Sequence, residues 1–363
     1  TVADPIEGRF RRTPGVAGRG LKLDGFTTVI VRKADAAPKL DDALTIEAWV
    51  ALAAYPWNWC PIVSCRDDQQ AGYAFSVGPR GQIQLQLLVN DQVNDQVQTC
   101  TSEDFSLPLR KWVHVAASFD PRRGFVLYIN GQPCGETDVT GQPALATEID
   151  LRLGSTHAPT KPAHIHREHG TLPNWFSLDG ILDEVKIYDR ALPARAIAAE
   201  YRRHRPAAAP DLPPRVMPAG PPGPGRFGAY YCRLKYYDEW DALWAVGPDP
   251  DVLVRFDHSP VRVVFWRGTR YSPAWVTGNG LWMADQSVEA WNNKEGCFEH
   301  MQDRRCRYSH VRIIENHDAR VVVHWRYAPV SVYDQLWRED EKTGRACWVD
   351  EYYTIYPDAI GVR

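Results

Sequence analysis

Residues 111–135 read KWVHVAASFDPRRGFVLYINGQPCG and contain two runs in which apolar side chains alternate with polar ones. Residues 112–119 and 125–129 have the period of two that is typical of β-strands. Asn130-Gly131 follows the second run directly, and this dipeptide favours a two-residue hairpin turn with positive φ. The stretch therefore predicts antiparallel strands joined by tight turns.

Similar runs occur upstream, at residues 44–50, 73–77 and 83–87. Many short strands with turn residues between them, and almost no helix, predict an all-β antiparallel sandwich. One helix is expected at residues 192–203, where a proline stands in the first turn and basic residues stand at the C-terminal end. We expect this helix to close the first domain.

A proline-rich stretch follows this helix. Residues 205–225 read RPAAAPDLPPRVMPAGPPGPG, and repeated proline prevents a helix or sheet from continuing. The chain has 363 residues, which is enough for two domains with separate cores. We therefore expect a domain at 1–204, a Pro/Gly-rich linker at 205–226 and a second antiparallel β-sandwich domain at 227–363.

The balance of acidic and basic residues limits the kinds of molecule that the protein can bind. The 42 Lys and Arg residues nearly offset the 45 Asp and Glu residues, so the net charge is -3. Binding to nucleic acid normally requires a basic excess, so we expect no nucleic-acid partner. No window approaches the length of apolar sequence that a membrane-spanning helix requires, so we expect no membrane span.

The cysteines and the N-terminus bear on location. Four cysteines precede the linker and four follow it, and no two form a C-x-x-C pair. We expect up to two disulfides in each half, with buried free thiols as the alternative. The N-terminus TVADP has no signal-peptide pattern, which fits a mature chain. We therefore expect a secreted or periplasmic protein.

Several stretches of the first half carry a family resemblance. They are GLKLDG at 20–25, LTIEAWV at 44–50, KWVHVAASFD at 111–120, VLYINGQPCG at 126–135, LRLGS at 151–155 and LDGILDEVKIYDRAL at 178–192. In this order they resemble the laminin-G-like, concanavalin A-type jelly roll of secreted bacterial carbohydrate-active proteins, over residues 20–203. The resemblance implies the fold, and a role in glycan binding, adhesion or domain packing.

Members of that superfamily often hold a structural calcium ion. The resemblance implies candidate ligands among the acids of the matching stretches, of which Asp24 and Asp183 are the principal candidates. Calcium prefers six to eight oxygen ligands, which carboxylates can supply. The alternative is that these acids cap turns.

Four histidines occur within a proline-containing stretch, at His157, His164, His166 and His169. They suggest a transition-metal site, but their spacing is not that of a zinc motif, and a solvent loop is the simpler interpretation. Such a loop could border a sugar-binding groove together with Trp175 and Phe176.

The second half contains a strong hairpin pattern at residues 307–327. Two alternating runs flank the expected turn 316–319, and Glu315 should pair with Arg320 across it. This register places one set of side chains on a shared face: Tyr308, His310, Arg312 and Ile314 beside Val321, Val323, Trp325 and Tyr327. Aromatic rings can pack on sugar rings, and cations can bind a carboxylate or sulfate. We therefore expect substrate contacts from Trp325, Trp282 and Trp175.

The polar residues of this face suggest an elimination reaction. Cleavage by β-elimination requires neutralisation of a uronate carboxylate, a base and an acid. Arg312 or His310 could neutralise the carboxylate, and Tyr308 or Tyr327 could transfer the protons, with His310 as a competing base. A hydrolase would instead need a close pair of acids, which no spacing in the second half favours. The alternative is a solvated surface without chemistry.

Three stretches of the second half resemble bacterial β-sandwich polysaccharide lyases of the ulvan lyase type. They lie at 266–286, 307–333 and 348–363. The resemblance implies a Tyr/His elimination mechanism on a uronate-bearing glycan, with Tyr308, His310 and Arg312 as the site residues. Those lyases continue well beyond the strand-like end at 361–363, so we expect the chain to lack part of a catalytic sheet.

Three functions remain open from the sequence. The first is a polysaccharide lyase that acts on an acidic, ulvan-like polysaccharide. The second is a glycan-binding protein without catalysis, in which the aromatic residues are contact platforms. The third is a structural subunit of an extracellular assembly, because protein interfaces are also rich in Tyr and Trp.

Overall fold

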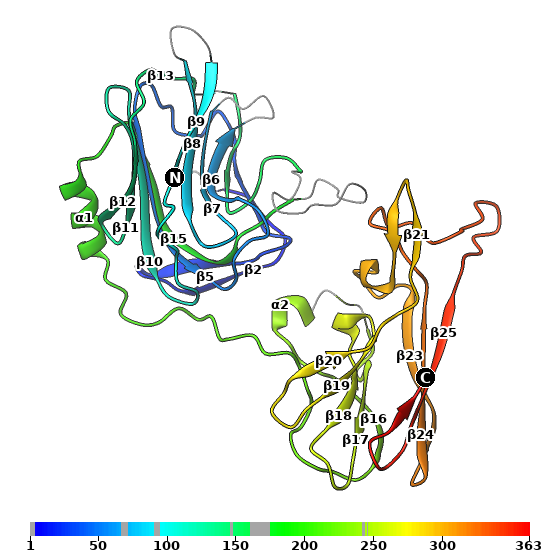
Figure 1. The fold of residues 1–363 in the computed structure, drawn as a ribbon. Coiled ribbons are helices and arrows are strands. Elements are labelled where there is room, and N and C mark those ends of the chain that lie inside the picture. The colour runs from blue at the N-terminus through cyan, green and yellow to red at the C-terminus, as the bar shows by residue number, and fades with distance from the viewer. Residues whose placement is uncertain are drawn as a thin grey trace. The chain divides into compact units, whose positions relative to one another are not determined.

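The computed structural model describes residues 4–66, 72–90, 95–145, 148–159, 175–241, 244 and 246–363, and all structural statements concern these residues. They divide into two compact units, with unit 1 ending at Pro214 and unit 2 running from Arg215 to Arg363. In their described residues, both units consist of antiparallel β-sheets with a few short helices (Figure 1). The predicted all-β fold class is confirmed.

Unit 1 is a sandwich of two sheets. One sheet has the order β1 (Ile6–Glu7), β4 (Val29–Arg32), β14 (Leu151–Leu153), β6 (Cys60–Arg66), β7 (Gly72–Val77), β8 (Ile83–Asn90) and β13 (Gln142–Pro143), and β9 (Asp95–Thr101) also pairs with β8. The other has the order β12 (Gln132–Thr137), β11 (Gly124–Ile129), β10 (Val113–Asp120), β5 (Leu44–Leu52), β15 (Asp179–Tyr188), β3 (Arg19–Asp24) and β2 (Phe10–Pro14). Both orders combine consecutive strands with neighbours that lie far apart in sequence, such as β14 beside β6 and β10 beside β5, as a jelly roll requires.

The core of unit 1 lies between these two sheets. From β5, Leu44, Ile46, Ala48 and Val50 point into it, because every second side chain of a strand faces the same side. The other sheet contributes residues such as Phe75, which is fully buried. The alternation seen in the sequence is therefore the pattern that fills this core.

The predicted hairpin and the predicted helix of unit 1 are both confirmed. Asn130 and Gly131 have φ values of 52° and 75° and connect β11 to β12. Helix α1 (Ala194–Arg203) packs on the outer face of the second sheet, where the Tyr201 ring stacks on Trp49 at 5.7 Å (Figure 1). Ile197 of the helix is buried against Ala116 and Tyr128 of the same sheet.

The proline-rich segment 205–226 extends across the limit between the units. In its first part, Leu212 is buried against Ala51 and Ile181 of unit 1. In its second part, the Ala219 carbonyl accepts a 2.8 Å hydrogen bond from Arg262 Nε of unit 2. Each part of the segment is thus fixed to one unit.

Unit 2 contains two larger sheets and one small hairpin. The first sheet has the order β16 (Gly228–Cys232), β17 (Asp251–Arg255), β18 (Arg262–Phe265), β19 (Pro273–Val276) and β20 (Trp282–Ala284). The second has the order β23 (Ser309–His317), β24 (Arg320–Tyr327), β25 (Val349–Ile355) and β26 (Gly361–Val362). The small hairpin consists of β21 (Ala290–Asn292) and β22 (Gly296–Phe298). Short helices are α2 (Asp238–Asp241), η1 (Arg267–Thr269) and η2 (His300–Gln302).

The two larger sheets of unit 2 pack face to face (Figure 1). Val252 and Val254 of β17 lie in one core cluster with Val321, Val323 and Trp325 of β24. A second β-sandwich therefore follows the first, as predicted.

The predicted disulfides are not present, because all eight cysteines are free. Cys60 and Cys65 lie on β6 with their side chains in the core of unit 1, and burial raises the pKa of the Cys65 thiol to about 11. In unit 2, the Cys306 thiol donates to the Arg267 carbonyl at 3.0 Å. The alternative of buried thiols fits these positions, and the argument from cysteines for an oxidising compartment loses its basis.

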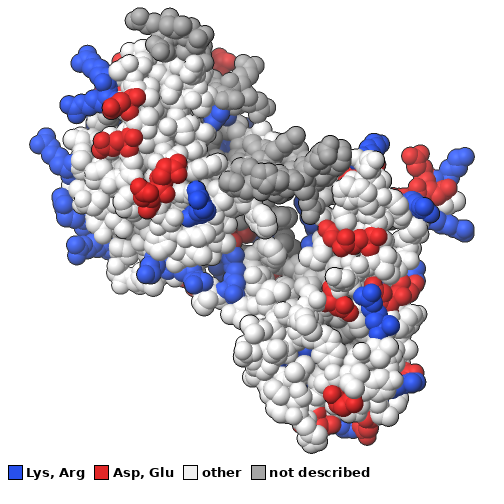
Figure 2. All heavy atoms as spheres, in the orientation of Figure 1, with Lys and Arg blue, Asp and Glu red and all other residues white. Residues whose placement is uncertain are grey.

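No helix in the described part of the chain is long and apolar enough to cross a lipid bilayer. Lys and Arg are interspersed with Asp and Glu on the face of each unit that Figure 2 shows.

Candidate functional site

The hairpin of β23 and β24 has a different register from the predicted one. His317 pairs with Arg320, so the turn is the two residues Asp318-Ala319 rather than the predicted four. A bulge between Ile313 and Glu315 then shifts the pairing by one residue, so that Val311 lies opposite Trp325. The expected ion pair forms all the same, with Arg320 Nε 2.6 Å from Glu315 Oε2.

This shift exchanges the predicted faces, because a slip of one residue moves every side chain of a strand to the other side. Val321, Val323, Trp325 and Tyr327 point into the core and are fully buried. The prediction that they share a face with Tyr308, His310 and Arg312 is wrong. Trp325 therefore does not offer a surface to a sugar, and Tyr327 is not available to substrate.

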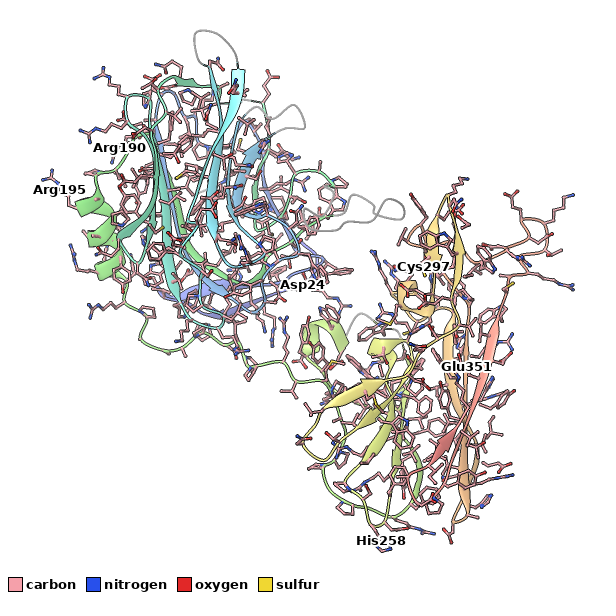
Figure 3. The ribbon with its side chains drawn as sticks, in the orientation of Figure 1. Asp24, Arg190, Arg195, His258, Cys297 and Glu351 are labelled. Carbon is pink, nitrogen blue, oxygen red and sulfur yellow. The ribbon has the colours of Figure 1, made fainter. Side chains whose placement is uncertain are left out.

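The hydroxyl of Tyr327 has a structural role instead. It donates a 2.7 Å hydrogen bond to Glu351 Oε1, while the Tyr353 hydroxyl donates to Glu351 Oε2 at 3.0 Å. Figure 3 shows Glu351 on β25. Burial and the bond to Glu351 raise the pKa of Tyr327, so this phenol keeps its proton and does not act as a base.

The opposite, outer face of β23, β24 and β25 carries a polar and aromatic surface that we call the outer patch. Cross-strand pairing places Arg312 beside His324 and Tyr352, and His310 beside Arg326 and Asp350. Tyr308 and Trp348 lie just before β23 and β25, and their rings are 6.4 Å apart. The outer patch is defined as Tyr308, His310, Arg312, His324, Arg326, Trp348, Asp350 and Tyr352.

His324 lies at the centre of the outer patch and is buried. Arg312 Nε donates to its Nδ1 at 3.0 Å, and its Nε2 lies 2.6 Å from Asp350 Oδ1. The Tyr352 ring stacks on the imidazole, with centroids 4.6 Å apart. His324 thus holds the Arg312 guanidinium in place and is itself covered by an aromatic ring.

Trp348 forms a platform at the other end of the outer patch. The Arg326 guanidinium lies over its ring at 4.8 Å, and the His310 ring stacks on it at 6.2 Å. Arg326 also pairs with Asp350 at 3.2 Å. Trp348 remains 36% exposed, which leaves part of the ring available to a ligand.

The local environment of His310 favours the neutral imidazole. Partial burial lowers the pKa of His310, and the positive charge of Arg326 lowers it further, against an opposite effect of Asp303. A neutral imidazole can accept a proton. Among the residues predicted to be catalytic, His310 is therefore the one that is prepared to act as a base.

Buried Asp303 fixes the start of β23 and thereby positions Tyr308. Its carboxylate accepts the backbone N–H groups of Arg307 and Tyr308 at 2.9 and 2.8 Å. The structure thus brings Tyr308, His310 and Arg312 together on one face, without Tyr327.

Five members of the outer patch were not predicted: His324, Arg326, Trp348, Asp350 and Tyr352. The sequence contains a signal for three of them, because WVDEYYTIY at 348–356 alternates with a period of two. That pattern places Trp348, Asp350 and Tyr352 on one face of a strand. The predicted register would place His324 and Arg326 on the face opposite Trp325, away from His310, because neighbouring side chains of a strand alternate.

The other predicted substrate contacts lie elsewhere. Trp282 is on β20 of the first sheet of unit 2, where its ring contacts Trp266 at 6.3 Å. Trp175 belongs to unit 1, is 47% exposed, and has the Arg152 guanidinium over its ring at 5.2 Å. Neither residue is part of the outer patch.

The two principal calcium candidates accept hydrogen bonds from two different loops. Asp24, at the end of β3 (Figure 3), accepts hydrogen bonds from the backbone of Phe26, Thr27 and Thr28. Burial raises the pKa of Asp24, but these bonds and one from the Thr27 side chain outweigh burial, so the pKa is lowered. Asp183 instead accepts from the backbone of Val16 and Ala17 in another loop. Turn capping, the alternative interpretation, accounts for both acids, and calcium binding stays a prediction.

Of the four clustered histidines, His157 lies in the described part of the chain, and its Nε2 is 2.6 Å from the Asp150 carbonyl. His164, His166 and His169 lie outside the described residues. A group that the sequence did not suggest is Glu289, Cys297 and Glu299, whose potential ligand atoms lie within 4.8 Å of one another. Figure 3 marks Cys297 on β22.

Comparison with solved structures gives matches of low similarity. Domain 4 of AbnA, a GH43 extracellular arabinanase from Geobacillus stearothermophilus, is 16% identical with a TM-score of 0.38, over 53% of this chain and 81% of that chain. The CBM40 of a Ruminococcus gnavus IT-sialidase, bound to α2,3 sialyllactose, is 14% identical with a TM-score of 0.37, over 50% of this chain and 96% of that chain. A Trypanosoma rangeli sialidase is 18% identical with a TM-score of 0.33, over 53% of this chain and 29% of that chain.

A search of the curated proteins finds no match to the chain. Residues 27–198 do match a family profile, described as the Concanavalin A-like lectin/glucanases superfamily. The resemblance of 227–363 to polysaccharide lyases lies outside these residues and stays a prediction. The matched residues cover most strands of the unit 1 jelly roll. Residues 27–198 are thus similar to the concanavalin A-like lectin/glucanases superfamily, which agrees with the jelly roll expected from the sequence.

Proposed function

We propose that the protein cleaves an acidic polysaccharide by β-elimination, and that the outer patch of unit 2 is the site. One observation carries the proposal: His310 and Arg312 lie two residues apart on one exposed face of β23, with the Trp348 ring beside them. Residues two apart on a strand are separated by about 7 Å, a distance that one sugar residue can bridge. A base and a carboxylate-binding cation can therefore act on the same uronate.

In this reaction Arg312 binds the uronate carboxylate and stabilises the charge that develops when the adjacent proton leaves. His310, as a neutral imidazole, takes the proton from C5. The electron pair of that C–H bond forms the C4=C5 double bond, and the bond from C4 to the glycosidic oxygen breaks. The Tyr308 phenol protonates the departing oxygen, and the proton on His310 is then returned to the tyrosine through solvent.

The remaining members of the outer patch position these groups. His324 holds the Arg312 guanidinium through a 3.0 Å hydrogen bond, and Asp350 holds the His324 ring through a 2.6 Å hydrogen bond. The exposed part of the Trp348 ring offers a flat apolar surface to a sugar, and Arg326 adds a second positive charge next to it. These contacts favour a sugar with more than one anionic group.

Binding of the same polysaccharide without cleavage is the second candidate function. It is favoured by the state of the arginines, since Arg312 is already held by His324 and Arg326 by Asp350. Fixed cations beside an aromatic ring are sufficient for recognition. Under either function the polymer is too large to enter a cell intact, so the proposal places the protein outside the cytoplasm.

The test is the ultraviolet absorbance of the unsaturated uronate that elimination produces. The chain is incubated in turn with ulvan, alginate, glucuronan and glycosaminoglycans. We expect a rise with at least one polymer, lost in His310→Ala and strongly reduced in Tyr308→Phe. His317→Ala, an exposed histidine of the same strand outside the outer patch, is the matched control and should retain the rate. A folded chain that binds a polymer without this product would support the second candidate.

A further inference from the structure

Unit 2 contains a second feature suited to an anionic ligand, a cavity of about 790 Å³. It lies between the proline-rich segment 216–221 and strands β16 and β17. We call it the basic groove and define it by Arg226, Tyr230, Arg233, Lys235, Leu253 and Arg255. None of these residues belongs to the outer patch.

The basic groove lies on the side of the sandwich opposite the outer patch. Leu253 points away from the core that Val252 and Val254 line, because neighbouring side chains of a strand face opposite sides. The outer patch lies on the outer face of the other sheet. The two features are therefore separate sites on the two outer faces of unit 2.

The wall that covers Leu253 is held firmly. Buried Arg262 donates from Nε to the Ala219 carbonyl at 2.8 Å. Gly220 has a φ of +73°, and a Cβ at this position would meet Leu253 Cδ2 at 2.9 Å. This close approach of backbone to strand fixes segment 216–221 at a set distance from β17.

Among the described residues, those that line the basic groove include four cations and no carboxylate. Arg233 and Arg255 donate to the carbonyls of Pro248 and Pro224, at 2.9 and 2.8 Å. Carbonyl oxygens orient a guanidinium but do not neutralise its charge. Arg226 has an acidic partner, Asp318, at 3.6 Å, but both side chains are more than 80% exposed, so water screens the pair.

The apolar floor of the basic groove that a ligand can reach consists of Val216, Met217 and the Tyr230 ring, which are 72%, 38% and 39% exposed. The Tyr230 hydroxyl donates to the Arg226 carbonyl at 2.9 Å, which fixes the ring. A sugar ring has apolar C–H faces that pack on such a surface, while its carboxylate or sulfate groups point to the cations at the rim. A small inorganic anion would leave the apolar floor uncovered.

We propose that the basic groove is a second binding site for acidic polysaccharide, which takes uronate or sulfated sugar residues. The class of ligand rests on the proposed function, whereas the site itself rests on the cavity and its charges. Two sites on one unit raise the apparent affinity for a long chain, because the second contact becomes intramolecular. A polymer held in the basic groove is thereby kept near the outer patch.

The experiment measures binding of a glucuronan hexasaccharide by calorimetry, with maltohexaose as the neutral comparison. The full chain carries Arg312→Ala and His310→Ala so that the outer patch does not contribute. On this background we expect Arg226→Glu with Lys235→Glu to weaken binding at least tenfold. Lys294→Glu with Lys342→Glu, the same charge change at exposed positions away from the groove, should leave the affinity unchanged. Thermal melts of each variant check that it folds.

Equal affinity in the groove variant and the control variant would overturn the inference, and so would no binding by the folded chain. Tyr230→Ala provides a second comparison and should weaken binding without altering its salt dependence. The same charge changes in the chain with an intact outer patch should raise KM for the polymer and leave kcat unchanged. If the chain cleaves the polymer and the groove substitutions do not change KM, the inference that the basic groove binds polysaccharide is wrong, while the proposed function stands. If binding depends on the groove residues and no cleavage product forms, the lyase proposal is wrong, while the inference of a binding site in the basic groove stands.

Discussion

Arg312 Nε donates a 3.0 Å hydrogen bond to Nδ1 of His324, which lies opposite it on the neighbouring strand. Because Nδ1 accepts this bond, the ring proton is on Nε2, which donates to Asp350 on the third strand at 2.6 Å. One chain of hydrogen bonds therefore crosses β23, β24 and β25. It fixes the guanidinium at the place where the proposal requires a carboxylate to bind.

Arg312→Lys tests this geometry. Lysine keeps the positive charge but lacks the Nε donor that holds His324, and it cannot bind a carboxylate through two parallel bonds. We expect kcat/KM to fall at least tenfold, equivalent to about 1.4 kcal/mol of transition-state stabilisation. Urea unfolding should change by less than about 1 kcal/mol, because the side chain is exposed. An unchanged rate would show that the Arg312–His324 bond has no part in the reaction.

The pH dependence of the cleavage rate should follow the protonation of His310. Its pKa is lowered, first by burial and then by Arg326, so the neutral base persists below the usual histidine value of about 6.5. Activity should be lost only as the pH falls through this lowered pKa. Arg326→Gln removes a positive charge, so the pKa should rise and the acid limb of the kcat/KM profile should move to higher pH. A limb that stays in place, or moves to lower pH, would rule out His310 as the base.

Trp325 and Trp348 should respond to replacement in opposite ways. Trp325 is fully buried, and its Nε1 donates to the Arg270 carbonyl at 3.0 Å. Trp325→Ala should therefore cost about 3 to 5 kcal/mol of unfolding free energy. Trp348→Ala should cost less than about 1 kcal/mol but weaken polymer binding, measured by affinity electrophoresis. Loss of binding in a folded Trp325 variant with Trp348 unchanged would contradict this assignment.

Asp24 should stabilise unit 1 without calcium. Asp24→Ala leaves the N–H groups of the 26–28 turn without their acceptor, which should cost about 1 to 3 kcal/mol. Its folded-state pKa is lowered, so this stabilisation is present above the usual aspartate pKa of about 3.9 and is lost as the pH falls through the folded value. Thermal melts with calcium and with chelator should coincide. A calcium-dependent rise in Tm that the variant abolishes would instead establish Asp24 as a ligand.

The jelly roll could be predicted because its signals are local. Asn130-Gly131 specifies a turn through positive φ, and the alternation in β5 and β10 specifies which side chains enter the core. The cysteines could not be assigned in this way, because pairing depends on three-dimensional distance. Cys60 and Cys65 point into an apolar core that accommodates a free thiol.

The site could be predicted only in part, because a single bulge decides its composition. The residue added between Ile313 and Glu315 leaves no mark in the alternating pattern, yet it moves Trp325 and Tyr327 from the expected surface to the core. Tyr308, His310 and Arg312 remained together because they lie on one side of the bulge. Trp348, Asp350 and Tyr352 join them from a strand distant in sequence, and pairing across strands is not a local property.

The origin of the oxygen in the product tests the central claim most directly. The chain is incubated with an acidic polysaccharide in water enriched in heavy oxygen, and the fragments are analysed by mass spectrometry. Elimination breaks the bond without adding water, so we predict fragments with an unsaturated non-reducing end and no heavy oxygen at the cleaved bond. Fragments with a saturated non-reducing end and heavy oxygen at the new reducing end would establish hydrolysis and contradict the account, as would a folded chain that releases no fragments from any uronate polymer.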